Sequence, residues 1–136
     1  MQNPEILGGA VLVFPERLSL GIFLTGVLFS PFILYYGISG GVFFLRRKEW
    51  DLLRGFNERL VAFEDIDFAL RLKRLAKSKG KKFKILWSSY IITSCRKFDK
   101  LGDYYYLNPL RLWRLYKQDR EEANKLWYHF HDTQKR

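Results

Sequence analysis

Residues 63–72 read FEDIDFALRL, which places three carboxylates at the start of a segment with helical apolar spacing. Apolar residues recur at that spacing from Phe68 to Ala76. Acidic side chains favour the first turn of a helix, where the positive end of the helix dipole lies. The stretch therefore predicts a helix over residues 64–78, with Gly80 as its C-cap.

The spacing of the acidic residues separates their expected roles. Asp65 precedes Ala69 and Leu72 by four and seven positions, so its side chain is expected on the buried side of the helix. Asp67 and Arg71 stand four positions apart and are expected to pair on the outer side. The helix dipole is expected to favour the ionised form of Asp65, which could then accept a proton or a hydrogen bond from a sugar hydroxyl. The alternative is that the carboxylates only cap the helix.

The segments on either side predict alternating strands and helices. Apolar runs bounded by glycine or proline favour strands, and longer periodic runs favour helices. In chain order we expect a strand over 10–14, a helix over 18–35, a strand over 41–45, a short helix over 48–53, a turn over 54–58, and extended pieces over 83–87 and 90–94. This alternation predicts an α/β fold over residues 1–108, with a short mixed sheet and flanking helices.

Residues 109–136 are expected to form a separate C-terminal segment. From residue 110 to residue 130, leucine and aromatic side chains alternate with arginine and lysine at helical spacing. This pattern predicts an amphipathic helix, which could dock on the domain or lie at a membrane interface.

Composition narrows the classes of protein to which the chain can belong. Its 136 residues, 48% of them hydrophobic and 18% aromatic, are enough for one domain, or part of one, with a core. The formal charge of +10 favours an anionic partner, which could be a nucleotide diphosphate, a lipid headgroup or a nucleic acid. The single cysteine excludes an internal disulfide framework, and with only two histidines besides it argues against a structural zinc site. A reducing, cytoplasmic setting is the default for such a chain.

An uncharged stretch extends from Leu18 to Leu45 and raises the question of a membrane span. Several glycines and a Ser-Pro pair interrupt it, whereas Arg17 and the basic residues 46–48 flank it. We expect a helix that lies on or partly in a membrane, or is buried in the fold, in preference to a true span.

The densest basic run lies in residues 71–84, which hold eight lysines and arginines. It is expected to be a solvated helix face that complements the helix dipole and can contact anionic lipid. Nucleic-acid binding is disfavoured, because the run lacks interleaved aromatics and a groove-reading motif. Arg96 and Lys97 follow a strand and are placed either for a diphosphate or as plain surface charge, and residues 100–102 are expected to turn the chain.

Five motifs follow one another in a fixed order: GGVFFLRR at 40–47, GFNE at 55–58, EDIDFALRL at 64–72, a glycine at 80 and TSCRK at 93–97. Their order and spacing resemble the second half of family-2 glycosyltransferases of the GT-A fold. The resemblance covers about residues 6–102. It implies a partial GT-A fold, in which Arg71 holds the start of the helix. Arg54 and Asn57 depart from the family's usual residues in the turn.

The resemblance implies inverting transfer of a sugar from a nucleotide-sugar donor to the hydroxyl of a glycan or lipid-linked acceptor. Asp65 would be the general base that deprotonates the acceptor hydroxyl. Glu64 would face the acceptor or the surroundings of the base, and Gly40 and Gly41 would line the sugar pocket. The full-length enzyme would act at a membrane or on a cell-surface glycan precursor.

The resemblance also places Arg96 and Lys97 near the leaving diphosphate. In the family an Asp-x-Asp motif holds Mg²⁺ or Mn²⁺ on that diphosphate, but no such motif precedes Gly40, and residues 65–67 carry this spelling only inside the helix. The chain therefore resembles the acceptor-side part of the enzyme, with the metal ligands mostly outside it. We expect it to have no transferase activity alone and to leave a sheet edge exposed.

A second hypothesis from a different class is a non-enzymatic basic protein. It would bind an anionic membrane peripherally through residues 18–36 and 110–130, at the inner face of the cell membrane. The two hypotheses are compatible in one molecule, although only the first explains the placement of Glu64 and Asp65.

Overall fold

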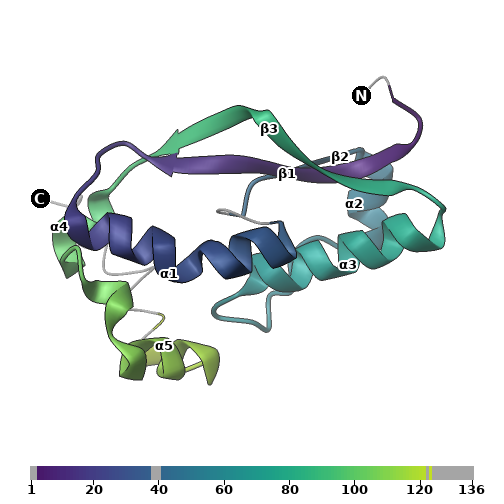
Figure 1. The fold of residues 1–136 in the computed structure, drawn as a ribbon. Coiled ribbons are helices and arrows are strands. Elements are labelled where there is room, and N and C mark those ends of the chain that lie inside the picture. Colours follow the sequence, from purple (N-terminus) through teal and green to yellow (C-terminus); the bar gives the residue numbers. More distant parts are fainter. Residues whose placement is uncertain (1–2, 38–40, 122, 124–136) are drawn as a thin grey trace, which may run out of the picture.

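Three strands form the sheet on which the fold is built. The computed structural model describes residues 3–37, 41–121 and 123 (Figure 1). Strands β1 (Ile6–Pro15), β2 (Phe43–Leu45) and β3 (Lys82–Thr93) lie in the order β2-β1-β3, with β1 antiparallel to β2 and parallel to β3. The sheet is therefore mixed, as expected, and β2 and β3 each form an edge of it.

Two glycines allow β1 to lie closely between its neighbours. A Cβ on Gly9 would stand 1.7 Å from the carbonyl oxygen of Lys84 in β3, and one on Gly8 would stand 2.7 Å from that of Phe44 in β2. Real Cβ atoms do not approach backbone that closely, so any side chain at either position would force the strands apart.

β3 joins two segments that were expected to be separate. Its partners along β1 step from Leu86, opposite Val11, to Tyr90, opposite Leu12, so residues 87–89 form an irregularity inside a single strand. The same strand arches away from β1 near its middle in Figure 1. Strand β1 is also longer than the strand expected over 10–14, because pairing with both of its neighbours extends it.

The helices follow the predicted order, with two additions between residues 96 and 107. They are α1 (Leu20–Tyr36), α2 (Arg47–Leu53), α3 (Glu64–Ser78), α4 (Arg96–Leu101), a short 3₁₀ helix η1 (Tyr105–Leu107) and α5 (Pro109–Tyr116). α1 and α3 lie on one side of the sheet (Figure 1). The turn expected at 100–102 is wrong in part, because residues 96–101 form α4. No helix in the described part of the chain is long and apolar enough to cross a membrane.

The core under the sheet confirms the predicted face of α3. Phe68, Ala69 and Leu72 are fully buried, and Ala76 is nearly so. Phe68, Leu72 and Ala76 pack with Leu7 of β1 and with partly buried aromatic and leucine side chains of β2, α2 and β3. Burying each large apolar side chain contributes about 1.5–3 kcal/mol, so this cluster fixes α3 against the sheet.

The C-terminal helix ends earlier than the spacing of apolar residues predicted. α5 stops at Tyr116 because Gln118 takes a left-handed conformation (φ +60°). Its side-chain Oε1 accepts hydrogen bonds from the backbone N–H groups of Val61 (2.9 Å) and Ala62 (3.3 Å), and its Nε2 donates to the carbonyl of Ala62 (3.1 Å). The predicted single helix over 110–130 is therefore wrong at this point, and its residues 122 and 124–130 lie outside the described chain.

A second apolar cluster joins α5 to the rest of the fold. Buried side chains of Ala62, Tyr105, Leu115 and Ala123 pack together there. Asn108, at the predicted boundary, caps α5 by accepting hydrogen bonds from the first turn of that helix.

Candidate functional site

The N-terminus of α3 places the acidic residues as their spacing predicted. α3 begins at Glu64, after Phe63 in a left-handed conformation (φ +62°) that turns the chain sharply into the helix. Phe63 provides no side-chain cap. The carboxylate of Asp65 accepts a hydrogen bond from the backbone N–H of Ile66 (2.8 Å). This contact satisfies one backbone donor of the first helical turn, so Asp65 does in part cap the helix, as the alternative interpretation of the sequence predicted.

The environment of Asp65 raises its pKa. The side chain is half-buried, and burial disfavours the charged carboxylate more than the backbone hydrogen bonds from Ile66 and from Asp65 itself favour it. The effect runs against the one expected from the helix dipole, because loss of hydration outweighs it here. A carboxylate with a raised pKa is a stronger proton acceptor once it is ionised.

Gly41 lies directly against Asp65. Its φ of +70° is a conformation that favours glycine, and a Cβ at this position would stand 3.4 Å from Cβ and 3.7 Å from Oδ2 of Asp65. The absence of a side chain at Gly41 therefore leaves the carboxylate open on this side. The structure thus brings these two predicted site residues together, whereas Gly40 lies outside the described residues.

Lys97, in the first turn of α4, lies near Glu64. Burial lowers the pKa of the Lys97 amine to about 8, while attraction to the Glu64 carboxylate opposes that shift. At neutral pH the amine is mostly charged and partly desolvated, so it would interact strongly with an anion. Arg96 does not share this environment, because it is exposed and its backbone N–H donates to Ser94 Oγ (3.4 Å).

α4 is held in place by two residues that follow β1. The carboxylate of Glu16 accepts hydrogen bonds from the backbone N–H of Cys95 (2.8 Å) and from the Ser94 hydroxyl (3.1 Å). Arg17 pairs with Asp99 and with Asp103 (2.9 Å), and this pairing lowers the pKa of the Asp103 carboxyl. This anchor was not predicted from the sequence, although the opposite charges of Glu16 and Arg17 stand side by side after a predicted strand.

Arg71 confirms the pairing predicted for the outer side of α3 and does more. Its Nε donates to Oδ2 of Asp67 (2.8 Å). Its two terminal nitrogens donate to the carbonyls of Leu53 (2.7 Å) and Gly55 (3.0 Å). Arg71 therefore holds the turn after α2, in which both Arg54 and Gly55 have positive φ.

The arrangement brings Gly41, Glu64, Asp65 and Lys97 to one end of α3. It can accept a proton at Asp65 and attract an anion at Lys97. Across the described ranges, no three His, Cys, Asp or Glu side chains gather closely enough to hold a metal ion, so these residues do not fit a Mg²⁺ or Mn²⁺ site.

The chain was also compared with protein-family models, with curated proteins and with solved structures. None of the three comparisons finds a match.

Proposed function

We propose that this chain is the acceptor-side part of an inverting glycosyltransferase of the GT-A fold, with Asp65 as the general base. The observation that carries the proposal is the half-buried Asp65 carboxylate, whose pKa is raised and which is left open by Gly41. For a purely structural carboxylate such a setting is unfavourable, because burial disfavours the charged form by more than the hydrogen bond from Ile66 favours it. A general base benefits from such a setting, because a raised pKa makes the ionised carboxylate a stronger proton acceptor.

In the proposed reaction Asp65 takes the proton of the acceptor hydroxyl. The hydroxyl oxygen forms a bond to the anomeric carbon as the bond from that carbon to the diphosphate oxygen breaks, with inversion. The bond electrons leave with the diphosphate. The partly desolvated ammonium of Lys97 would stabilise the negative charge that develops there.

Glu64 has a supporting role in this scheme. Its carboxylate attracts the Lys97 ammonium and so opposes the lowering of the amine pKa by burial. Gly41 leaves room for the acceptor sugar beside the base. A divalent metal would stabilise the diphosphate in the complete enzyme. Because the described residues do not fit such a site, no step performed by this chain is assigned to a metal.

The donor-binding half has to come from outside these 136 residues. The sheet edge at β2 is compatible with pairing to a further strand, since β2 is bonded only to β1 among the described strands. The first observation to make is therefore whether the coding region upstream of residue 1 encodes strand-helix units that end in Asp-x-Asp.

The test uses a longer protein that contains both halves, with sugar transfer measured on a panel of nucleotide sugars. Asp65→Asn is expected to lower the turnover number by at least 100-fold, the usual scale for a general base. Asp67→Asn is the matched control, because it makes the same chemical change two residues away, at a carboxylate that pairs with Arg71. Asp65→Asn with unchanged turnover would refute the assignment, and so would sugar transfer by the 136-residue chain alone.

A further inference from the structure

The outer side of α1 is apolar, and no element of the described chain covers it. Glycine, isoleucine and threonine at 21, 22 and 25 are buried against the fold. The opposite side exposes large apolar side chains, with exposed fractions between 53% and 78% for Leu20, Phe23, Val27, Leu34 and Tyr35. An apolar helix normally hides both sides, so this surface calls for an apolar partner.

The hydroxyl groups of Thr25 and Ser30 bond to carbonyls of α1 itself. Pro31 has no N–H to donate to the carbonyl of Val27, and the hydroxyl of Ser30 donates to that carbonyl instead (2.7 Å). The hydroxyl of Thr25 donates to the carbonyl of Gly21 in the same way (2.8 Å). Water would satisfy an exposed carbonyl such as that of Val27 without help. Internal pairing is what a helix needs where water is absent.

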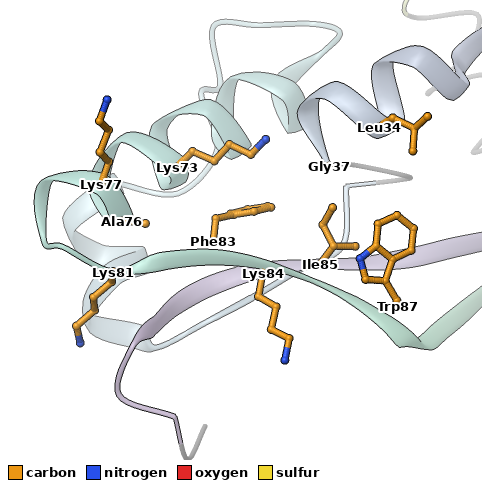
Figure 2. A pocket seen from close by; sticks show the side chains of 10 residues that line it. All are labelled: Leu34, Gly37, Lys73, Ala76, Lys77, Lys81, Phe83, Lys84, Ile85 and Trp87. Carbon is orange, nitrogen blue, oxygen red and sulfur yellow. The ribbon is translucent and has the colours of Figure 1, made fainter.

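A groove with cationic edges continues this surface at the C-terminal end of α1. It has a volume of about 590 Å³ and lies between α1, α3 and β3. Leu34, Phe83 and Trp87 line it with apolar surface, and none of its ten lining residues is acidic. In Figure 2 Phe83 lies in the middle of the view, between α3 and β3, with Leu34 on α1 and Trp87 on β3 to its right.

Lysines supply the charge of the groove. Lys73 lies along it, with its Nζ 5.1 Å from the centre of the Phe83 ring and 3.4 Å from the carbonyl of Tyr35. In Figure 2 Lys77 extends away from the groove on the α3 side, and Lys81 and Lys84 extend away from it on the other side of β3. The carbonyl of Tyr35 is at the negative end of the α1 dipole, so it favours a cation but leaves the other ammonium donors for an anion.

We propose that the outer side of α1 and this groove form one docking surface for a bilayer that contains anionic phospholipid. α1 lies in the plane of the membrane interface, with its outer side among the acyl chains, and the groove lysines bind headgroup phosphates. The fold itself supplies the polar side that an isolated interfacial helix has to carry. A 17-residue helix is about 25 Å long, enough to contact several lipids.

The charge pattern favours lipid over the other candidate partners. A nucleic acid would neutralise the lysines but leave the apolar side of α1 in water. A second copy of the chain would cover that apolar side but would gain nothing from the lysines at its end. Only an anionic bilayer uses both features together. This proposal does not rest on the transferase proposal.

The experiment is flotation of the purified 136-residue chain with two kinds of vesicle, made of phosphatidylcholine alone or with about 30% phosphatidylserine. The protein is expected to float with the anionic vesicles and to be released when NaCl rises from about 0.1 M to about 0.5 M. Lys77→Gln with Lys81→Gln is expected to weaken the partition on the order of 30-fold, since each lysine near the surface contributes about 1 kcal/mol. Phe23→Ser with Val27→Ser is expected to abolish it.

The matched control is Lys48→Gln with Arg59→Gln, which removes the same charge from two exposed residues that do not line the groove. It is expected to bind much more tightly than the groove variant. Circular dichroism checks that each variant is folded. Three results would overturn the proposal: no flotation of the folded protein, equal losses for the two charge variants, or a stable dimer in light scattering that does not bind vesicles.

Discussion

Replacing Arg71 with methionine tests how the turn after α2 is held beside the candidate site. The change removes the two hydrogen bonds from the guanidinium to the carbonyls of Leu53 and Gly55, and the ion pair with Asp67. Methionine also replaces the guanidinium, whose carbon stands 5.4 Å from the centre of the Phe68 ring, with an uncharged thioether.

The expected cost follows from these contacts. A hydrogen bond to a charged group contributes about 1.5–3 kcal/mol, and a partly exposed ion pair about 0.5 kcal/mol. The side chain of Arg71 is 25% exposed, so water can reach part of what the methionine leaves unpaired. We therefore expect the free energy of unfolding to fall by about 2–4 kcal/mol, a large share of the roughly 5–15 kcal/mol typical of a domain. The melting temperature should fall by on the order of 10 °C.

Urea unfolding followed by circular dichroism measures this cost. Asp67→Asn removes only the ion pair and should lower the free energy of unfolding by about 0.5 kcal/mol. Arg71→Lys keeps the charge but can reach only some of the three acceptors, so it should fall between the other two variants. The reasoning is wrong if Arg71→Met unfolds within about 0.5 kcal/mol of the unchanged protein, or if Asp67→Asn costs as much as Arg71→Met.

Three further outcomes are expected around the end of α3. Asp65→Asn should raise the free energy of unfolding at pH 7, because burial disfavours the charged form of the carboxyl group. The gain should shrink in acid, where the carboxyl group of the unchanged protein becomes protonated. A gain seen only in acid would contradict this sign. Gly41→Ala should cost about 1–2 kcal/mol in urea unfolding, since alanine at positive φ is strained, and an unchanged midpoint would show that the conformation is not required. The rate of acetylation of Lys97, followed by mass spectrometry as the pH is varied, should have its midpoint near pH 8. Glu64→Gln should move this midpoint lower, because it removes an attraction that favours the ammonium. A midpoint near that of free lysine would refute the burial of the amine.

Local patterns in the sequence predicted most of the helices. α3 has the predicted bounds because all of its signals lie in the helix or directly after it. These signals are the acidic first turn, the apolar spacing and the glycine that follows the helix. The same holds for α1 and α2, which differ from their predicted bounds by two residues or fewer. The buried side of α3 also followed from spacing alone, and Asp65 lies on the side that was predicted.

Non-local contacts account for what the sequence did not reveal. The end of α5 depends on Gln118 and on two backbone groups 56 and 57 positions away, which no periodicity can indicate. α4 depends on Glu16 and Arg17, nearly 80 positions before it. The approach of Lys97 to Glu64 follows from that anchor, and the pKa of Asp65 depends on burial that only the assembled fold provides.

The contact made by Gln118 also couples the position of the C-terminal helix to the position of the candidate site. Its side-chain amide bonds to residues 61 and 62 as a neighbouring strand would, and Phe63 follows at once with the backbone conformation that starts α3. From Gln118 to Asp65 the connection therefore passes through one side chain and three residues of backbone. A ligand or partner that displaces α5 would move residues 61 and 62 through these hydrogen bonds. The start of α3 would move with them, so a change at the C-terminal helix would change the position of the Asp65 carboxylate.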